Sequence, residues 1–399
     1  MTRLDSLTGI RAVAALLVFW HHSSSRFEGS LSSGMVGVSL FYLLSGFVMA
    51  WTDRPGESAW RYYRKRFARI YPAYLVACAL VIGWRAVRSG FEFTDLAALT
   101  LLQSWVPDPA IYFAAQAIFW SLSCETFFYL AFPMIRLMTR RLKGAGLTLL
   151  GVAAGVVSTC VAVVGVGLPD DVAQWATGIF PLARIPEFVV GVVIGTLFSR
   201  GWRPRISLMW TVPLAAFAVA VAAFAPLALS RYAITLIPFV LLVVALAASD
   251  LEGRANIFGS RPMVTLGVWS YCIYLVHGLA LWGTDAVAMR LHLPATVSVA
   301  AALVLTCVGA WLLHRVVEAP AERLLRPRGR ALNSSCCRIA SCTVLAPHWW
   351  PFPSTARCSC PRHRPRRRYR TRSGRGGCIC SRRRWRRATS DGHSTRPSA

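Results

Sequence analysis

The residues near the start of the chain that are best suited to chemistry are Arg11 and His22, which lie eleven positions apart in the apolar segment 5–24. In an α-helix this spacing places both side chains within about 20° of one face and roughly 16 Å apart along the axis. A cation and a titratable base on one stripe of a membrane-length helix are costly to bury, so the pair indicates a functional site. The alternative is that Arg11 anchors the helix at the membrane interface and His22 lies at its hydrated end.

The composition of the chain is that of a membrane protein. Of its 399 residues, 55% are hydrophobic and only 15% are charged, and apolar runs of membrane length recur along it. The first run continues into HHSSSRFEGS rather than a small-residue cleavage site, which favours a retained span over a cleaved signal peptide. We predict an all-α, polytopic membrane protein of about ten transmembrane helices, at residues 8–24, 34–52, 70–88, 117–136, 146–167, 175–198, 207–226, 231–249, 264–288 and 295–316.

The distribution of basic residues predicts which side of the membrane each loop lies on. Segments 54–69 and 136–143 carry six and four Lys or Arg residues, whereas the loops expected on the other side carry one or two each. By the positive-inside rule, both termini are cytoplasmic and the protein is a multi-pass protein of the cytoplasmic (inner) membrane. Segment 89–116, which contains Trp105 and Tyr112, is expected at the outer interface, either as a lid over an outward-facing site or as a plain interfacial loop.

A basic stretch follows the second predicted span. Arg61, Lys65 and Arg69 share one helical face at i, i+4 and i+8, and Arg64 and Arg66 lie beside them. Topology alone explains a basic cytoplasmic loop. A cluster of arginines also suits a multiply phosphorylated ligand, so a phosphate-binding site is the functional alternative.

Further ionisable groups fall inside predicted spans. Glu125 lies among aromatic residues at the start of the fourth span, where it should pair with an arginine, orient a histidine or remain protonated. Arg184 and Glu187 are helix neighbours at i, i+3 and are expected to form a structural ion pair. A lone histidine such as His277 is more often a hydrogen-bonded core residue than a catalyst, and both interpretations stay open.

Six blocks of sequence occur in a specific order: LTGIRAVAALLVFWHH, GMVGVSLFYLLSGFVMAW, RKRFARIYPAYL, FWSLSCETFFYLAFP, LGVWSYCIYLVHG and VEAPAERLLR. Together they resemble the acyltransferase-3 family of integral-membrane O-acyltransferases over residues 4 to about 326, including its Arg-x10-His signature at Arg11 and His22. Two departures stand out. Thr126 replaces the second carboxylate of the family's SLSxEE run, which leaves that role to Glu125, and the ending reads EAP rather than ERP.

The resemblance implies transfer of an acyl group, commonly acetyl, from a coenzyme A thioester to a hydroxyl of a polysaccharide, cell-surface sugar, lipid-linked glycan or macrolide-type metabolite. It also implies that Arg11 and His22 are required. We hypothesise that His22 is the general base and that Glu125 orients an imidazole or balances a buried arginine. His21 is the rival base. The phosphates of acyl-CoA would bind Arg61, Arg64, Arg66 and Arg69, and further candidates for the site are His277 and Ser123.

Acyl-CoA is thus expected as a co-substrate, with no permanently bound cofactor and no metal. The expected partners are acyl-CoA, a hydroxyl-bearing glycan or metabolite, and the lipid bilayer, with no specific nucleic acid. The alternative function is a transporter or exporter of a glycan or metabolite that uses Arg11, Glu125 and His277 as an ion relay. The absence of an evident internal repeat weakens that alternative.

The composition changes abruptly after residue 330. Residues 331–399 contain 16 Arg and one Asp and no apolar periodicity, which predicts a disordered cytoplasmic tail beside a membrane-embedded acyltransferase domain at 1–330. Its arginines and aromatic residues favour contact with anionic lipid over nucleic acid. Its Cys-x-Cys pairs do not have the spacing of a known zinc-ligand set. A scaffold role for the tail and an out-of-frame reading of GC-rich DNA remain as alternatives.

Overall fold

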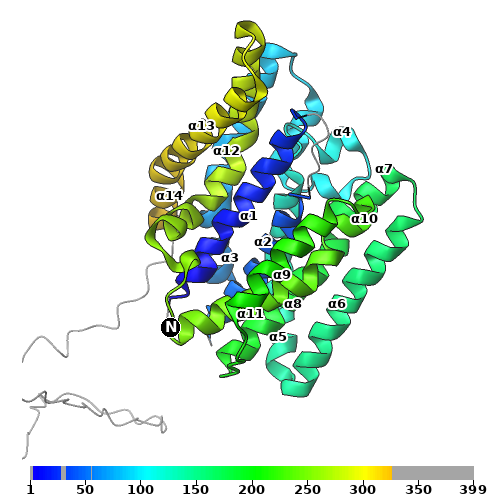
Figure 1. The fold of residues 1–399 in the computed structure, drawn as a ribbon, viewed down its shortest axis with the longest axis vertical. Coiled ribbons are helices and arrows are strands. Elements are labelled where there is room, and N and C mark those ends of the chain that lie inside the picture. The colour runs from blue at the N-terminus through cyan, green and yellow to red at the C-terminus, as the bar shows by residue number, and fades with distance from the viewer. Residues whose placement is uncertain (1–2, 28–32, 55, 326–399) are drawn as a thin grey trace, which may run out of the picture. The chain divides into compact units, whose positions relative to one another are not determined.

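The computed structural model describes residues 3–27, 33–54 and 56–325, and every regular element in this part of the chain is helical. The prediction of an all-α fold is therefore confirmed. The described residues form one compact unit, drawn in Figure 1. The predictions for the tail, including its disorder and its Cys-x-Cys pairs, lie outside the described residues.

Each predicted span corresponds to one main helix. These are α1 (Asp5–Ser24), α2 (Val36–Trp51), α3 (Ala59–Arg88), α5 (Trp120–Arg141), α6 (Gly144–Val166), α8 (Pro181–Ser199), α9 (Leu208–Ala222), α11 (Ala233–Leu251), α12 (Arg261–Leu291) and α13 (Ala295–Leu313). Within the described residues, six helical stretches are long and apolar enough to cross a membrane: Ala59–Arg88, Gly144–Val166, Asp170–Ser199, Leu227–Leu251, Arg261–Leu291 and Ala295–Leu325. Helices α2 and α9 are shorter and apolar. A polytopic membrane fold is confirmed, while the number of ten spans and the cytoplasmic termini stay predictions.

Short helical segments connect the long ones. The predicted interfacial segment contains η1 (Phe93–Thr100), η2 (Gln103–Trp105) and α4 (Pro109–Tyr112). The helix α8 is preceded by α7 (Asp170–Ala173) and the π-helical η3 (Gln174–Ile179), and α11 is preceded by α10 (Leu227–Ser230). The remaining short elements are η4 (Ile257–Gly259), the π-helical η5 (His314–Glu318) and α14 (Ala319–Leu325).

The largest difference from the predicted spans is the start of α3. This helix begins at Ala59, whereas the apolar run begins near residue 70. The hydroxyl of Ser58 accepts a hydrogen bond from the backbone N–H of Arg61 and so caps the helix. The basic stretch therefore belongs to a continuous helix, which holds its side chains in fixed directions.

Glycines allow the central helices to approach closely. A Cβ on Gly191 of α8 would lie 2.1 Å from the carbonyl oxygen of Leu43 in α2. On the two sides of α1, a Cβ on Gly37 would lie 2.4 Å from Ala14 O, and one on Gly267 would lie 1.9 Å from Thr8 O. Small residues at such contacts are the usual basis of helix packing in a bilayer. They hold α1 between α2 and α12 (Figure 1).

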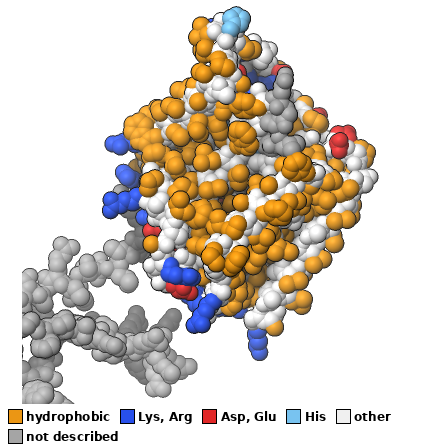
Figure 2. All heavy atoms as spheres, viewed as in Figure 1, with side chains coloured by type: hydrophobic (Ala, Val, Ile, Leu, Met, Phe, Trp, Pro, Cys, Tyr) orange, Lys and Arg blue, Asp and Glu red, His pale blue; other side chains and the backbone are white. Residues whose placement is uncertain are grey.

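The outer surface is largely apolar. Figure 2 shows hydrophobic side chains across most of one face, with Lys and Arg gathered mainly toward its lower and left edges. Exposed apolar residues occur on α6, α9 and α13, for example Val164, Phe217 and Val304. Extensive exposed apolar surface of this kind suits contact with lipid.

Candidate active site

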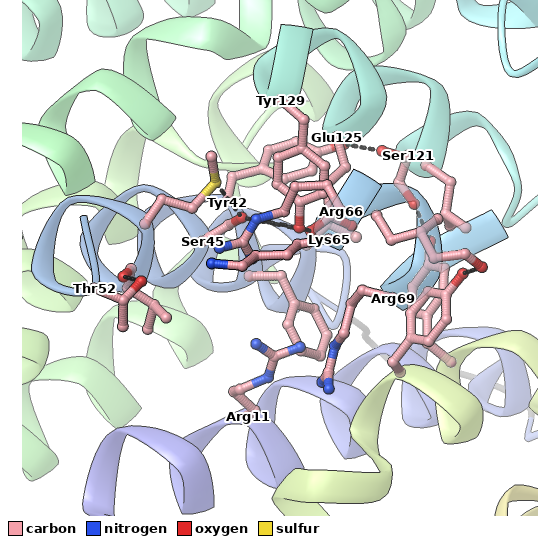
Figure 3. A pocket seen from close by; sticks show the side chains of 18 of the residues that line it. Arg11, Tyr42, Ser45, Thr52, Lys65, Arg66, Arg69, Ser121, Glu125 and Tyr129 are labelled. Carbon is pink, nitrogen blue, oxygen red and sulfur yellow. Dashed lines mark hydrogen bonds between the residues drawn. The ribbon is translucent and has the colours of Figure 1, made fainter. Parts of the chain in front are cut away.

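A cavity of about 620 Å³ opens beside the N-terminal half of α1. Figure 3 shows Arg11 of α1 and Arg69 of α3 directed into it, with Lys65 and Arg66 nearby. We call it the basic cavity, because its lining contains six Lys or Arg side chains and two carboxylates: Arg11, Arg54, Arg61, Lys65, Arg66, Arg69, Glu57 and Glu125. This excess of positive charge suits an anionic ligand.

Arg11 is held by two contacts from neighbouring helices. Its Nε donates a hydrogen bond to Ser270 Oγ of α12 at 3.2 Å, and its guanidinium carbon lies 5.7 Å from the centre of the Phe41 ring in α2. Neither contact neutralises the charge. Arg11 therefore presents a fixed cation to the basic cavity.

The α3 residues of the basic cavity differ in how they are held. Arg69 forms ion pairs with Glu322 at 2.9 Å and with the buried Glu318 at 3.4 Å. The guanidinium of Arg66 instead lies over the rings of Tyr62 and Tyr129, 5.7 and 5.6 Å from their centres. A cation over an aromatic face keeps its charge available to a ligand.

Three of the four predicted phosphate ligands line the basic cavity: Arg61, Arg66 and Arg69. The fourth, Arg64, is exposed and does not line it. Lys65 also lines the cavity and forms an ion pair with Glu57. Arg64 differs from the others because positions 61, 65 and 69 share one face of the helix and position 64 points away from that face.

Glu125 lies in the basic cavity and not beside a histidine. Its Oε1 accepts a hydrogen bond of 2.5 Å from the Tyr129 hydroxyl and lies 3.4 Å from Ser45 Oγ. Within the described residues it makes no ion pair and no hydrogen bond with an imidazole. The carboxylate therefore faces the cations across the cavity (Figure 3), which matches the charge-balancing role more closely than the imidazole-orienting one.

His22 and His277 form a pair. His22 Nδ1 lies 3.3 Å from His277 Nε2 and 2.9 Å from the carbonyl oxygen of Val18, and His277 Nδ1 lies 2.7 Å from the carbonyl oxygen of Tyr274. A carbonyl only accepts, so each Nδ1 carries a proton in the neutral rings. His277 Nε2 is then an acceptor for His22, and Nε2 of His22 keeps a lone pair for which the described residues offer no hydrogen-bond donor. This is the tautomer that a general base requires.

A second cavity, of about 280 Å³, lies at the other end of α1. We call it the histidine cavity, and it is lined by His21, His22, Ser33, Met35, Phe113, Ala117, Trp120, Gln174, Gly178, Ile179, Leu227, Ser230 and Arg231. Trp120 lines the histidine cavity while the next residue, Ser121, lines the basic cavity. The first turn of α5 thus separates the two.

Tyr274 links the two cavities. Tyr274 lines the basic cavity, and its hydroxyl donates to Ile118 O at 2.8 Å and lies 2.6 Å from Ser121 Oγ. Its carbonyl holds His277. Tyr274 was not among the site residues predicted from the sequence, although its i, i+3 spacing to His277 was a usable signal. Tyr129, which lies at i+4 from Glu125, was not predicted as a site residue either.

The remaining residues predicted from the sequence lie outside the basic cavity. His21 lines the histidine cavity beside His22, with ring centres 5.2 Å apart. Ser123 is buried and lines neither cavity. The predicted ion pair of Arg184 and Glu187 is confirmed, with Nε and Oε1 2.8 Å apart and both side chains buried.

The fold and the two cavities define a polytopic membrane enzyme in which one helix carries an arginine into one cavity and a histidine into the other. A family model described as an acyltransferase domain matches residues 4–315. The chain therefore belongs to the acyltransferase-3 family and is a membrane acyltransferase, as its motifs predict.

Named relatives agree with this assignment. The chain is 34% identical over 367 residues to acyltransferase MdmB of Streptomyces mycarofaciens, covering 82% of this chain and 94% of that protein. It is 30% identical to the exopolysaccharide production protein ExoZ of Rhizobium meliloti (strain 1021), covering 78% and 95%. It is 21% identical to O-acetyltransferase OatA of Staphylococcus aureus (strain COL), covering 80% and 57%. No solved structure matches the chain significantly.

Proposed function

We propose that the protein transfers an acyl group, acetyl by default, from acyl-CoA to a hydroxyl of a carbohydrate or of a glycosylated metabolite. The observation that carries the proposal is the free Nε2 of His22 at the histidine cavity, with the cationic basic cavity on the other side of α5. The names of ExoZ and OatA, which refer to an exopolysaccharide and to O-acetyl transfer, support this class of acceptor and reaction.

In this proposal, acyl-CoA enters from the cytoplasm and its phosphates bind the basic cavity at Arg61, Arg66 and Arg69. Charge-assisted hydrogen bonds from arginine to phosphate are strong and directional. The pantetheine arm extends along Arg11 toward the first turn of α5, and the acceptor occupies the histidine cavity. The protein acts in the cytoplasmic membrane.

The chemical step uses His22 as general base. The acceptor hydroxyl gives its proton to His22 Nε2 while its oxygen attacks the thioester carbonyl carbon. The carbon–sulfur bond then breaks, and the leaving thiolate takes the proton from the imidazolium. Coenzyme A leaves as a free thiol, the acceptor carries the new ester, and the imidazole is again neutral.

Release of coenzyme A thiol by the purified full-length protein tests the proposal. We expect release to depend on acyl donor and on an acceptor extract, and to fall about 10²–10⁴-fold in His22→Ala, the usual contribution of a general base. His21→Ala, altered at the neighbouring position, should retain most activity. Full activity of His22→Ala would overturn the assignment of the base, and a protein that only transports would release no thiol. Mass spectrometry of surface glycans and secreted metabolites, with and without the gene, would identify the acceptor by a lost acyl mass.

A further inference from the structure

The wall of the histidine cavity contains a buried arginine without a counter-ion. Arg231 lies just before α11, and the residue is only 7% exposed. Its Nη1 donates to the carbonyl oxygen of Gln174 at 2.8 Å. Among the described residues, no other hydrogen-bond partner and no carboxylate pairs with this guanidinium, and Asp171 of the nearby α7 is exposed and forms no ion pair with it. Burying an uncompensated charge is costly.

A second buried arginine beside it shows how this fold compensates such a charge. Arg184 forms an ion pair with Glu187 and donates from Nη2 to Ser39 Oγ at 2.8 Å. The same Ser39 hydroxyl donates to the backbone carbonyl of Arg231 at 3.0 Å. This polar cluster therefore fixes the backbone of Arg231 and neutralises Arg184, but leaves the Arg231 charge unbalanced at the cavity.

The backbone of η3 makes room for this charge. A Cβ on Gly178 would lie 1.7 Å from Arg231 Nη1, so any larger residue would displace the guanidinium. Gly178 and Gln174 both belong to η3 and both line the histidine cavity. Short π-helical segments occur frequently at functional sites. Two features of η3, an accepting carbonyl and a missing side chain, thus hold Arg231 at the cavity wall.

We infer that Arg231 binds an anionic group of the acceptor, a carboxylate or a phosphate, inside the histidine cavity. This inference rests on the proposed function, because the occupant of the cavity is the acceptor. A guanidinium offers a planar fork of N–H donors that matches either oxyanion. The acceptor is then an acidic sugar or sugar phosphate that places a hydroxyl at His22, an oxyanion at Arg231 and its apolar ring face near Trp120.

Thermal unfolding of the purified full-length protein in detergent tests the inference without requiring activity. The probes are methyl β-glucuronide for a carboxylate, glucose 1-phosphate for a phosphate, methyl β-glucoside as the neutral control and inorganic phosphate as a free anion. A ligand that binds only the native state raises the unfolding temperature. We expect at least one anionic sugar to stabilise the wild type more than the glucoside does. A larger effect of the carboxylate or of the phosphate probe identifies the group.

Variants of Arg231 separate binding from structure. In Arg231→Gln, the affinity for the anionic sugar should fall about 10–100-fold, as expected for loss of a charge-assisted hydrogen bond, and the ligand-free protein should unfold at a higher temperature. Arg231→Lys should restore part of the affinity. Arg290→Gln, which alters an exposed arginine at the end of α12, is the matched control and should bind like wild type. Gly178→Ala should weaken binding as Arg231→Gln does.

Two results would overturn the inference. They are equal stabilisation of the wild type by glucoside and anionic sugars, and an unchanged affinity for the anionic sugar in a folded Arg231→Gln protein. The wild-type comparison remains decisive if the variant does not fold, and stabilisation by inorganic phosphate alone, without a preference for an anionic sugar, also counts against an acceptor site. The thiol-release assay shows separately whether the proposed function fails. If the wild type binds acidic sugars but releases no thiol, the anion site stands and the proposed transfer from acyl-CoA is wrong.

Discussion

His22 of α1 and His277 of α12 share a hydrogen-bond contact, with Nδ1 of the first 3.3 Å from Nε2 of the second. The carbonyl oxygen of Tyr274 accepts a hydrogen bond from Nδ1 of His277. Nε2 of His277 is therefore the unprotonated nitrogen and faces His22 as an acceptor. The partnership leaves Nε2 of His22 unprotonated in the neutral ring. The contact between the two histidines thus sets the tautomer of His22, the proposed base.

This contact predicts a graded effect of substitutions at His277. His277→Phe removes the acceptor for His22 Nδ1–H and should lower the turnover number roughly fivefold, since one hydrogen bond contributes about 1 kcal/mol. His277→Gln retains a side-chain acceptor and should recover part of the rate. Initial rates of thiol release measure both. Wild-type rates in a folded His277→Phe protein would show that Val18 O alone is enough to orient His22.

Two neighbouring arginines on different faces of α3 should affect the KM for acyl-CoA differently. Arg66→Gln removes a cation from the basic cavity and should raise the KM for acyl-CoA about 10–100-fold, the expected loss for a charge-assisted hydrogen bond. It breaks no described ion pair. Arg64→Gln, two residues away on the exposed face, should leave KM unchanged. Equal effects of the two substitutions would indicate a general electrostatic attraction and no specific site.

Gln116 predicts a substitution that increases stability. Both polar atoms of its amide are buried and have no hydrogen-bond partner among the described residues, and a Cβ on Gly278 would lie 2.0 Å from its Nε2. Buried polar groups without partners cost about 1–3 kcal/mol. Gln116→Met keeps a similar length, removes both polar atoms and should raise the unfolding temperature of the purified protein. A lower temperature would mean that the amide is satisfied by a partner such as bound water.

The packing of α2 on α8 predicts a contrast between two glycines. Gly191→Ala would place a Cβ 2.1 Å from Leu43 O and should force the helices apart, with a marked loss of thermal stability and expression. Gly155→Ala in α6 meets no atom within 4 Å. It should be neutral or should stabilise by up to about 1 kcal/mol, the difference in helix propensity. Fluorescence-detected size-exclusion after heating compares the two variants, and tolerance of Gly191→Ala would contradict the packing described for α2 and α8.

The sequence by itself determined the all-α membrane architecture, the position of Arg11 and His22 on one helix, and the shared face of Arg61 and Arg69. Each of these follows from local periodicity, because apolar run length and a helical repeat of 3.6 residues are readable within one segment. The sequence also singled out Glu125 as a carboxylate in need of a partner, and the residue order that resembles the acyltransferase-3 family was confirmed over residues 4–315.

Only the tertiary structure decided which of these groups meet. The rotation of α12 against α1 places His277 beside His22, and the depth of α5 leaves Glu125 in the basic cavity instead of near an imidazole. The absence of a described counter-ion for Arg231 is visible only once α8, α11 and η3 are packed. Helix rotation and depth arise from contacts between segments distant in sequence, and hydropathy along one segment contains no information about them.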